Sequence, residues 1–231
     1  MERTILTPRL KLTLVEKAER GSQELAWLHA IRSDEKTTWW SIHGTSKNLE
    51  DTEKHIMTIL PAPATDTPDP EPKAIRIVYA IHEILPNGSA NATDDVPTRF
   101  IGIMTLKSLF PTTLPEADHL FPPSTRSPTS VLTMELGYLF LPVAWSRGFA
   151  TESVKAVLGA CKSAPKEMWF PWEKVFVQAI VDKENAGSRR VMEKSEMRAL
   201  GDYRWEGNEV WMSGRWRGWM ELMFWGMWIV E

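Results

Sequence analysis

The segment from Met134 to Glu152 combines residue types that suit the binding of a phosphate group. An apolar stretch ends at Pro142, and a short run of small and polar residues then leads into a helical pattern. A strand that turns directly into the start of a helix presents unpaired backbone N–H groups and the positive end of the helix dipole. We therefore expect this segment to bind a phosphorylated ligand.

Three residues of this turn have a clear physical role in the prediction. Gly148 has no Cβ, so backbone N–H groups can approach an anion closely there. Ala150 keeps the first helical turn slim, and Arg147 can add a charge-assisted contact to a phosphate. The alternative is that Gly148 and Ala150 only make a tight connection between a strand and a helix.

The composition is that of a soluble globular protein without an obvious surface for polyanions. The chain has 231 residues, of which 43% are hydrophobic and 25% charged, and its net charge of −3 argues against electrostatic binding of nucleic acid. The N-terminus lacks the apolar run of a signal peptide, and the most apolar tract, 222–230, is too short to cross a bilayer. We expect one cytoplasmic domain spanning residues 1–231, with neither a membrane nor a nucleic acid as partner.

Cysteine and histidine usage predicts neither an intrachain disulfide nor a metal site. Cys161 is the one cysteine of the chain, and it falls in a predicted helix. We interpret it as a small buried hydrophobic residue and not as a nucleophile. The five histidines have no metal-ligand spacing.

Hydrophobic periodicity predicts an α/β (α+β) fold with about seven strands in a mixed sheet and about four helices. Three Pro- or Gly-rich stretches, near 61–73, 86–98 and 107–130, are interpreted as loop insertions within the one domain. Residues 206–216 are expected to form a turn-rich connection. The predicted strands are 9–15, 75–81, 100–106, 131–141, 174–181, 199–205 and 219–230, and the predicted helices are 22–32, 48–60, 151–162 and 185–194.

Two motifs, and the number of residues between them, give this chain a resemblance to a known family. The first is Glu135-Leu136-Gly137-Tyr138 with Trp145-Ser146-Arg147-Gly148-Phe149-Ala150-Thr151-Glu152, and the second is Asn185-Ala186-Gly187-Ser188 running into Val191-Met192-Glu193-Lys194. The chain resembles the GCN5-related N-acetyltransferase (GNAT) superfamily over nearly its whole length. Within it, the chain is similar to the branch of the ribosomal-protein alanine acetyltransferases, RimJ/RimL-like. The family pyrophosphate loop has the pattern Gln/Arg-x-x-Gly-x-Gly/Ala. Gly148 and Ala150 match its fourth and sixth positions, and Trp145 stands at the first, where this branch usually has Trp.

The resemblance implies a GNAT fold in which the fourth and fifth predicted strands, 131–141 and 174–181, splay apart. It also implies acetyl-coenzyme A (acetyl-CoA) as donor, a primary amine as acceptor, and pantetheine pairing with the backbone edge 137–141. We expect direct attack of the amine in a ternary complex, and a monomer or a homodimer. The implied cofactor-binding residues are Leu139, Phe140, Leu141, Trp145, Ser146, Arg147, Gly148, Phe149, Ala150, Thr151, Asn185 and Ser188.

Glu135 and Ser188 are the candidate catalytic residues. Strand alternation places Glu135 beside Gly137, on the face opposite Leu136 and Tyr138, so we propose Glu135 as the general base. The alternative is a structural carboxylate bonded to a neighbouring loop. The resemblance implies Ser188 as the acid for the departing thiolate, because the helix that follows Asn185 offers no tyrosine; the alternative is simple helix capping.

The acceptor side is aromatic. By position in the fold, Trp39, Trp40 and Trp211 could line the acceptor mouth, whereas we expect Trp219, Trp225 and Trp228 to pack the last strand into the core. The family usually has a Gly-Phe pair where this chain has Glu196-Met197, and often a glycine where it has Ser146. These departures keep a second class of function open, a non-catalytic or degenerate CoA-binding regulatory module.

Overall fold

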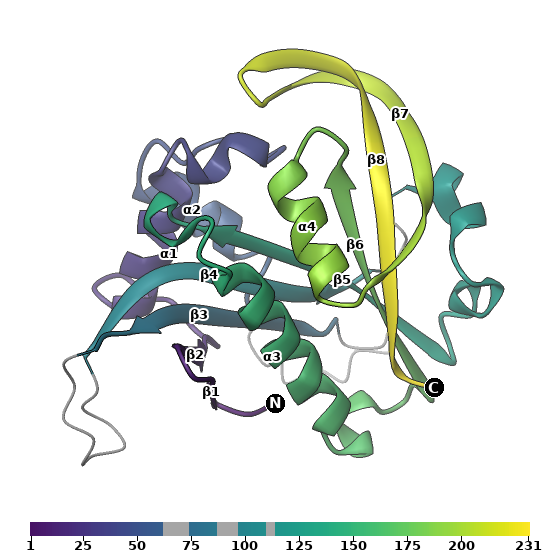
Figure 1. Cartoon of the computed structure of the whole chain (residues 1–231), viewed down its shortest axis with the longest axis horizontal. Helices are drawn as coiled ribbons and strands as arrows, with labels where there is room; N and C mark the ends of the chain where they lie inside the picture. Colours follow the sequence, from purple (N-terminus) through teal and green to yellow (C-terminus); the bar gives the residue numbers. More distant parts are fainter. Residues whose placement is uncertain (62–73, 87–96, 110–113) are drawn as a thin grey trace.

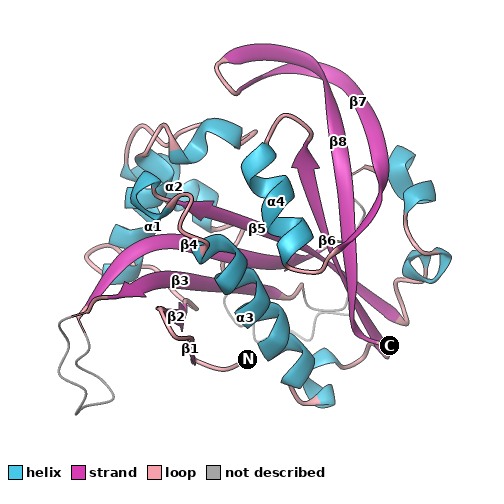
Figure 2. Ribbon diagram, in the orientation of Figure 1, coloured by secondary structure: helices cyan, strands magenta, loops and turns pink. Residues whose placement is uncertain are grey.

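One mixed sheet of eight strands forms the centre of the computed structural model, which describes residues 1–61, 74–86, 97–109 and 114–231 (Figures 1 and 2). The strands lie in the order β1-β2-β3-β4-β5-β6-β8-β7, and among them only β5 and β6 are parallel neighbours. The strands are β1 (Thr4–Leu6), β2 (Leu10–Leu14), β3 (Arg76–Ile84), β4 (Thr98–Ser108), β5 (Val131–Phe140), β6 (Lys174–Asp182), β7 (Arg198–Met212) and β8 (Arg215–Val230).

Helices cover both faces of the sheet, and side chains cap the starts of the first two of them. The Ser22 side chain accepts a hydrogen bond from the Leu25 amide, and the Asn48 side chain accepts one from the Asp51 amide. The α-helices are α1 (Gln23–Ser33), α2 (Leu49–Ile56), α3 (Phe149–Ser163) and α4 (Ala186–Lys194). Short 3₁₀ helices are η1 (Thr37–Trp40), η2 (Pro115–Leu120), η3 (Pro123–Arg126), η4 (Pro142–Ala144) and η5 (Lys166–Trp169).

The two faces of β5 contact different helices, as its alternation predicts. Leu136 and Phe140 belong to the apolar cluster that includes α3 and α4, whereas Leu139 packs against the cluster of α1 and α2. The register between β4 and β5 runs without a shift, so no bulge changes which face each residue occupies. The predicted two-sided packing of this strand is confirmed.

Hydrogen bonding between β5 and β6 stops partway along both strands. The paired register runs from Val131 opposite Lys174 to Glu135 opposite Gln178, although β5 continues to Phe140 and β6 to Asp182. Each strand stays paired on its other side, β5 to β4 and β6 to β8. The predicted splay between these two strands is therefore confirmed.

The C-terminal hairpin differs from its predicted form. Residues 206–216, expected as a turn-rich connection, continue β7 and begin β8, with Ser213 and Gly214 between the two strands. The register shifts between Glu206 and Val210, so Gly207 and Asn208 lie in an irregularity of the strand and not in a turn that ends it. In Figure 1 the hairpin curls over the end of the sheet. The added β1 accounts for the eighth strand.

The proline-rich stretches are only partly within the described residues. Positions 62–73, 87–96 and 110–113 lie outside them, so the first two insertions stay predictions. The third, 107–130, is more than a loop, because it contains η2 and η3. Ala117 and Phe121 are buried there in the cluster that includes Phe224 of β8. Within the described part of the chain, no helix is both long and apolar enough to span a bilayer.

Helix α4 ends in a Schellman motif that contains a strained residue. The Met197 amide donates to the Met192 carbonyl and the Glu196 amide to the Glu193 carbonyl, and Met192 and Met197 share one apolar cluster. Glu196 takes a φ of 63°, the left-handed conformation that favours glycine. This is the position at which the family usually has glycine.

Glu196→Gly is therefore expected to stabilise the protein by about 0.5–1 kcal/mol, because relief of the left-handed strain exceeds the added entropy of the unfolded chain. The midpoint of thermal unfolding should rise by about 1–4 °C. Glu196→Ala is the matched control: it also removes the exposed contact with Lys155 at 3.1 Å but keeps a Cβ. An equal rise in both variants would contradict a backbone origin.

Candidate active site

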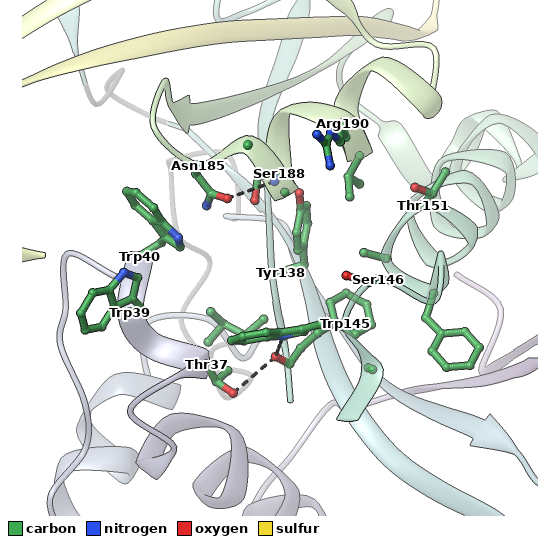
Figure 3. A pocket seen from close by; sticks show the side chains of 18 of the residues that line it. Thr37, Trp39, Trp40, Tyr138, Trp145, Ser146, Thr151, Asn185, Ser188 and Arg190 are labelled. Carbon is green, nitrogen blue, oxygen red and sulfur yellow. Dashed lines mark hydrogen bonds between the residues drawn. The ribbon is translucent and has the colours of Figure 1, made fainter. Parts of the chain in front are cut away.

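A cleft of about 840 Å³ lies where β5 and β6 separate, between η1, the turn that precedes α3, and α4 (Figure 3). Twelve of the residues predicted to bind cofactor or acceptor line it. They are Trp39, Trp40, Leu139, Phe140, Trp145, Ser146, Gly148, Phe149, Ala150, Thr151, Asn185 and Ser188. Four others, Glu135, Leu141, Arg147 and Trp211, are not among its lining residues.

The backbone edge of β5 faces the cleft through alternate residues. The Leu141 amide donates to the carbonyl of Ile101 in β4, so the backbone groups of the even-numbered residues Tyr138 and Phe140 face away from β4, toward the cleft. The Phe140 carbonyl already accepts the Trp145 indole N–H at 2.6 Å and the Thr37 hydroxyl at 3.3 Å. The indole of Trp145 thus fixes the turn to the end of the strand.

The turn presents the N-terminus of α3 to the cleft. Ser146 and Gly148 both have positive φ values, 59° and 79°, and Gly148 is the N-cap residue without a side-chain hydrogen bond. The first-turn amides of this helix of 15 residues therefore have no side-chain partner at the cap. An anion is the natural partner of such a helix end.

Residues from the start of the chain hold this turn. Arg9 donates through Nε to Glu152 at 2.8 Å and through Nη1 to the Arg147 carbonyl at 2.9 Å. The Thr7 hydroxyl also donates to Glu152, at 2.6 Å. Sequence reasoning missed these contacts, because they join residues that are more than 130 positions apart.

The Arg147 side chain has a protein partner. Its guanidinium pairs with Glu83 and stacks on the Phe149 ring, whose centroid lies 4.5 Å away, and the Arg9 guanidinium lies 4.8 Å from the same centroid. The hydrogen bond from Arg147, assisted by Arg99, holds the pKa of Glu83 below its usual range. A direct phosphate contact from the Arg147 side chain would compete with this ion pair.

Basic side chains that the sequence analysis did not select also line the cleft. Arg190 and Lys194 lie one turn apart on α4, and Lys36 precedes η1. The i, i+4 spacing of Arg190 and Lys194 is the sequence signal that could have identified them, because it places both on one face of the helix that begins after Asn185. The Asn185 side chain caps this helix by accepting a hydrogen bond from the Ser188 amide at 3.1 Å. Together with the uncapped end of α3, these cations suit a ligand with several phosphates.

Tyr138 is a further lining residue that the sequence analysis assigned to the core. Its ring packs against the α3–α4 cluster, as predicted, but its hydroxyl group points toward Ser188 (Figure 3). Burial raises the pKa of this phenol to about 12, so the hydroxyl keeps its proton at neutral pH. A tyrosine hydroxyl is thus present at the cleft, supplied by a strand and not by the helix.

Glu135 lies at the last paired position of β5 before the cleft opens. It is half-buried, opposite Lys107 of β4 and Gln178 of β6, and it has an interaction partner.

Cys161 is fully buried in the apolar cluster of α3, and burial raises the pKa of its thiol to about 12. The expectation that Cys161 is a buried hydrophobic residue is confirmed.

The hairpin of β7 and β8 contacts the aromatic side of the cleft. The Ser213 amide donates to the Trp39 carbonyl at 2.8 Å, and a Cβ on Gly214 would lie 2.5 Å from the Trp39 ring. Trp211 lies near the hairpin tip, edge-on to Trp216 at 5.7 Å. The predicted core role of Trp219 is wrong, because this residue lies beyond the last pair of β6 with β8, 49% exposed.

A buried ion pair fixes the hairpin to the loop before α4. Arg217 Nη1 lies 2.9 Å from Asp182 Oδ2, with both side chains at least 94% buried. The contact is an ion pair and not a well-aligned hydrogen bond. Asp182 Oδ1 also accepts from the Glu184 amide at 2.8 Å, which shapes the loop that carries Asn185. Within the described residues, no group of three or more potential metal ligands occurs.

Comparisons with known proteins agree with this geometry. A family model described as acetyltransferase (GNAT) domain matches residues 11–198. The fold is similar to a GNAT-family acetyltransferase from Bacillus anthracis (18% identity, 98% of each chain, TM-score 0.57). It is also similar to an acetyltransferase from Salmonella typhimurium that modifies the N-terminal serine of the ribosomal protein L7/L12 (11% identity, 96% of this chain and 95% of that one, TM-score 0.53).

A third similar structure is spermidine N-acetyltransferase from Vibrio cholerae in complex with CoA and spermine (14% identity, 94% of this chain and 95% of that one, TM-score 0.51). No curated protein sequence matches the chain. Because the family model covers most of the sequence, the protein belongs to the GNAT family of acetyltransferases. Acyl transfer from acetyl-CoA is general to this family, and the observed helix end and cationic lining fit the phosphates of that molecule.

Replacing Arg217 by Met is expected to destabilise the protein by about 3–5 kcal/mol, because it leaves the Asp182 carboxylate buried without its cation. Denaturant unfolding would measure the loss. The double variant Arg217→Met/Asp182→Asn should recover a substantial part of it, since no unpaired charge then remains. A single variant as stable as the wild type would contradict the structural importance of this ion pair.

Proposed function

We propose that the protein is an acetyl-CoA-dependent N-acetyltransferase that moves an acetyl group to a primary amine by direct attack in a ternary complex. The observation that carries this proposal is the cleft at the separation of β5 and β6, beside the uncapped N-terminus of α3. When bound, acetyl-CoA supplies an activated acetyl thioester. We propose that residues 1–231 act as a single domain, as a monomer or a homodimer.

The cofactor site is proposed to have two parts. The cleft-facing backbone groups of Tyr138 and the backbone amide of Phe140 would pair with an extended arm of the ligand, as in the addition of a strand to a sheet edge. The amides of the turn 146–151 would bind phosphate oxygens, with Arg190 and Lys194 as charge partners. Arg147 and Leu141 would then act by holding the turn and the strand end rather than by direct side-chain contact.

Two chemical tasks are assigned to side chains. Glu135 is the proposed general base that leaves the amine neutral, because a protonated amine has no lone pair for attack. Ser188 is the proposed hydrogen-bond donor to the departing sulfur. The buried, protonated Cys161 supports direct transfer without an acyl-cysteine intermediate, because its thiol lies in the core and not at the cleft.

The charge of the cleft supports an N-terminal amine or a small neutral or acidic amine as acceptor. Among the described lining residues Glu184 is the only carboxylate, and it is paired with Arg215 at 2.5 Å, while Lys36 adds a cation near Trp39 and Trp40. A polyamine would need carboxylates, and the described part of the lining offers Glu184 alone. The similar Salmonella acetyltransferase modifies an N-terminal serine, which supports the proposed RimJ/RimL-like branch.

A non-catalytic CoA-binding module is the second candidate function. It is favoured by the position of Glu135, which is at the edge of the cleft but not among its lining residues. This alternative predicts the same cofactor binding without turnover.

Thermal unfolding with CoA, acetyl-CoA or NAD tests the cofactor site. At a ligand concentration about 100 times the dissociation constant, binding to the native state adds about 2.7 kcal/mol. The midpoint should therefore rise by about 5–11 °C with either CoA species.

Gly148→Glu should abolish this rise, because a carboxylate at the helix end repels phosphate. Gly148→Gln is the matched control: glutamine has the size of glutamate and imposes the same backbone strain, but it carries no charge. This variant should keep more of the affinity for CoA. Full CoA affinity in the Glu variant, or a shift with NAD alone, would contradict the site.

Glu135→Gln tests the general base. Acetyl transfer to a panel of N-terminal peptides and small amines is expected to fall by about 10²–10⁴-fold in kcat, with the affinity for acetyl-CoA unchanged. Higher pH should recover part of the rate, because more of the amine is then neutral. An unchanged rate in this variant would exclude Glu135 as the base, and the absence of turnover in the wild type across the panel would favour the non-catalytic module.

A further inference from the structure

Tyr138 places a buried hydroxyl group at the cleft without a hydrogen bond of normal geometry. A buried hydroxyl that lacks a partner costs about 1–3 kcal/mol, and phenylalanine would fill the same volume without that cost. The rest of the ring is accounted for by packing against the α3–α4 cluster and Phe140. The oxygen atom therefore needs an explanation other than the stability of the core.

The polar group that this hydroxyl faces is the side chain of Ser188 (Figure 3). Ser188 lies in the first turn of α4, and its backbone position is fixed by the bond from its amide to Asn185. Its own hydroxyl can rotate, because a serine O–H has no preferred direction until a partner sets one. A donor on one side of the Ser188 oxygen would direct the serine proton to the other side.

We propose that Tyr138 is a positioning residue for Ser188, with the Tyr138 O–H donating to Ser188 Oγ so that the Ser188 proton points into the cleft toward the sulfur of CoA. This inference rests on the proposed function. The two hydroxyl groups face one another without a hydrogen bond of normal geometry, and catalytic hydrogen bonds commonly tighten when substrate is bound. Two hydroxyl groups in series also polarise one another, which strengthens the terminal bond.

The hydroxyl groups of Tyr138 and Ser188 both keep their protons over the whole reaction. The transfer forms a C–N bond, breaks the C–S bond, and moves one proton from the attacking nitrogen to the sulfur. The electron pair of the C–S bond stays on sulfur, where the Ser188 hydroxyl donates a hydrogen bond to the developing negative charge. The Tyr138 hydroxyl keeps its own proton, in accord with its burial.

The pKa of the CoA thiol in the complex measures this interaction without any acceptor. It can be followed by the ultraviolet absorbance of the thiolate, with the complex of desulfo-CoA, which lacks the sulfur, as the blank. The wild-type complex should hold the thiol pKa below that of free CoA. Tyr138→Phe should raise it by about half a unit to one unit, the effect of one weak hydrogen bond. Ser188→Ala should raise it at least as much, and the double variant should show no further shift.

Two controls separate positioning from a structural role. Tyr203→Phe removes a phenol hydroxyl on β7, outside the cleft lining, and should leave the thiol pKa unchanged. The ligand-free Tyr138→Phe protein should unfold at the same temperature as the wild type or a higher one. A lower midpoint would indicate a structural hydroxyl and would overturn the proposal.

Two further outcomes distinguish the failure of this inference from that of the proposed function. Normal CoA binding with an unchanged thiol pKa in Tyr138→Phe, or a further shift in the double variant, would overturn the positioning role alone. If neither CoA nor desulfo-CoA binds the wild-type protein, the proposed function fails, and this inference with it.

Discussion

The site depends on the point at which β5 and β6 cease to pair. Each strand remains bonded to its other neighbour, while the space between the two strands opens after Glu135 and Gln178. Backbone groups at such an opening need partners, because unpaired polar groups are costly when buried. The protein itself satisfies one of them, the Phe140 carbonyl, through Trp145 and Thr37. The neighbouring groups on this edge are those with which the proposed extended arm of the ligand would pair.

The turn before α3 is held by charged side chains that pair with one another. Arg9 and Arg147 lie against the Phe149 ring, and their guanidinium groups are paired with Glu152 and Glu83. These pairs neutralise the side chains nearest the turn. In the proposed site, attraction of phosphate would therefore fall to the amides of α3 and to the cations of α4. The contacts that hold the turn come from the protein itself.

Local pattern was sufficient for some elements and not for others. The alternation around Glu135 predicted both faces of β5, and Asn48 and Asn185 predicted helix starts, because these features depend on neighbouring residues. The partner of Arg147 was beyond sequence reasoning, since Glu83 is 64 positions away. The role of Tyr138 was hidden because periodicity describes where its ring packs and not where its hydroxyl lies. Residues 206–216 were expected as a turn-rich connection, yet pairing with β8 resumes at Val210 after the irregularity at Gly207 and Asn208.

The overhang of the β7–β8 hairpin has a consequence for how relatives can diverge. Residues 204–219 lie beyond the end of the β6–β8 ladder, and the GNAT match ends at residue 198, the first residue of β7. Insertions or deletions near Ser213 would change the contact with Trp39 while leaving the sheet and the turn before α3 intact. In evolution, acceptor preference could therefore drift through the length of one hairpin, while the half of the cleft that suits the donor stays under separate selection.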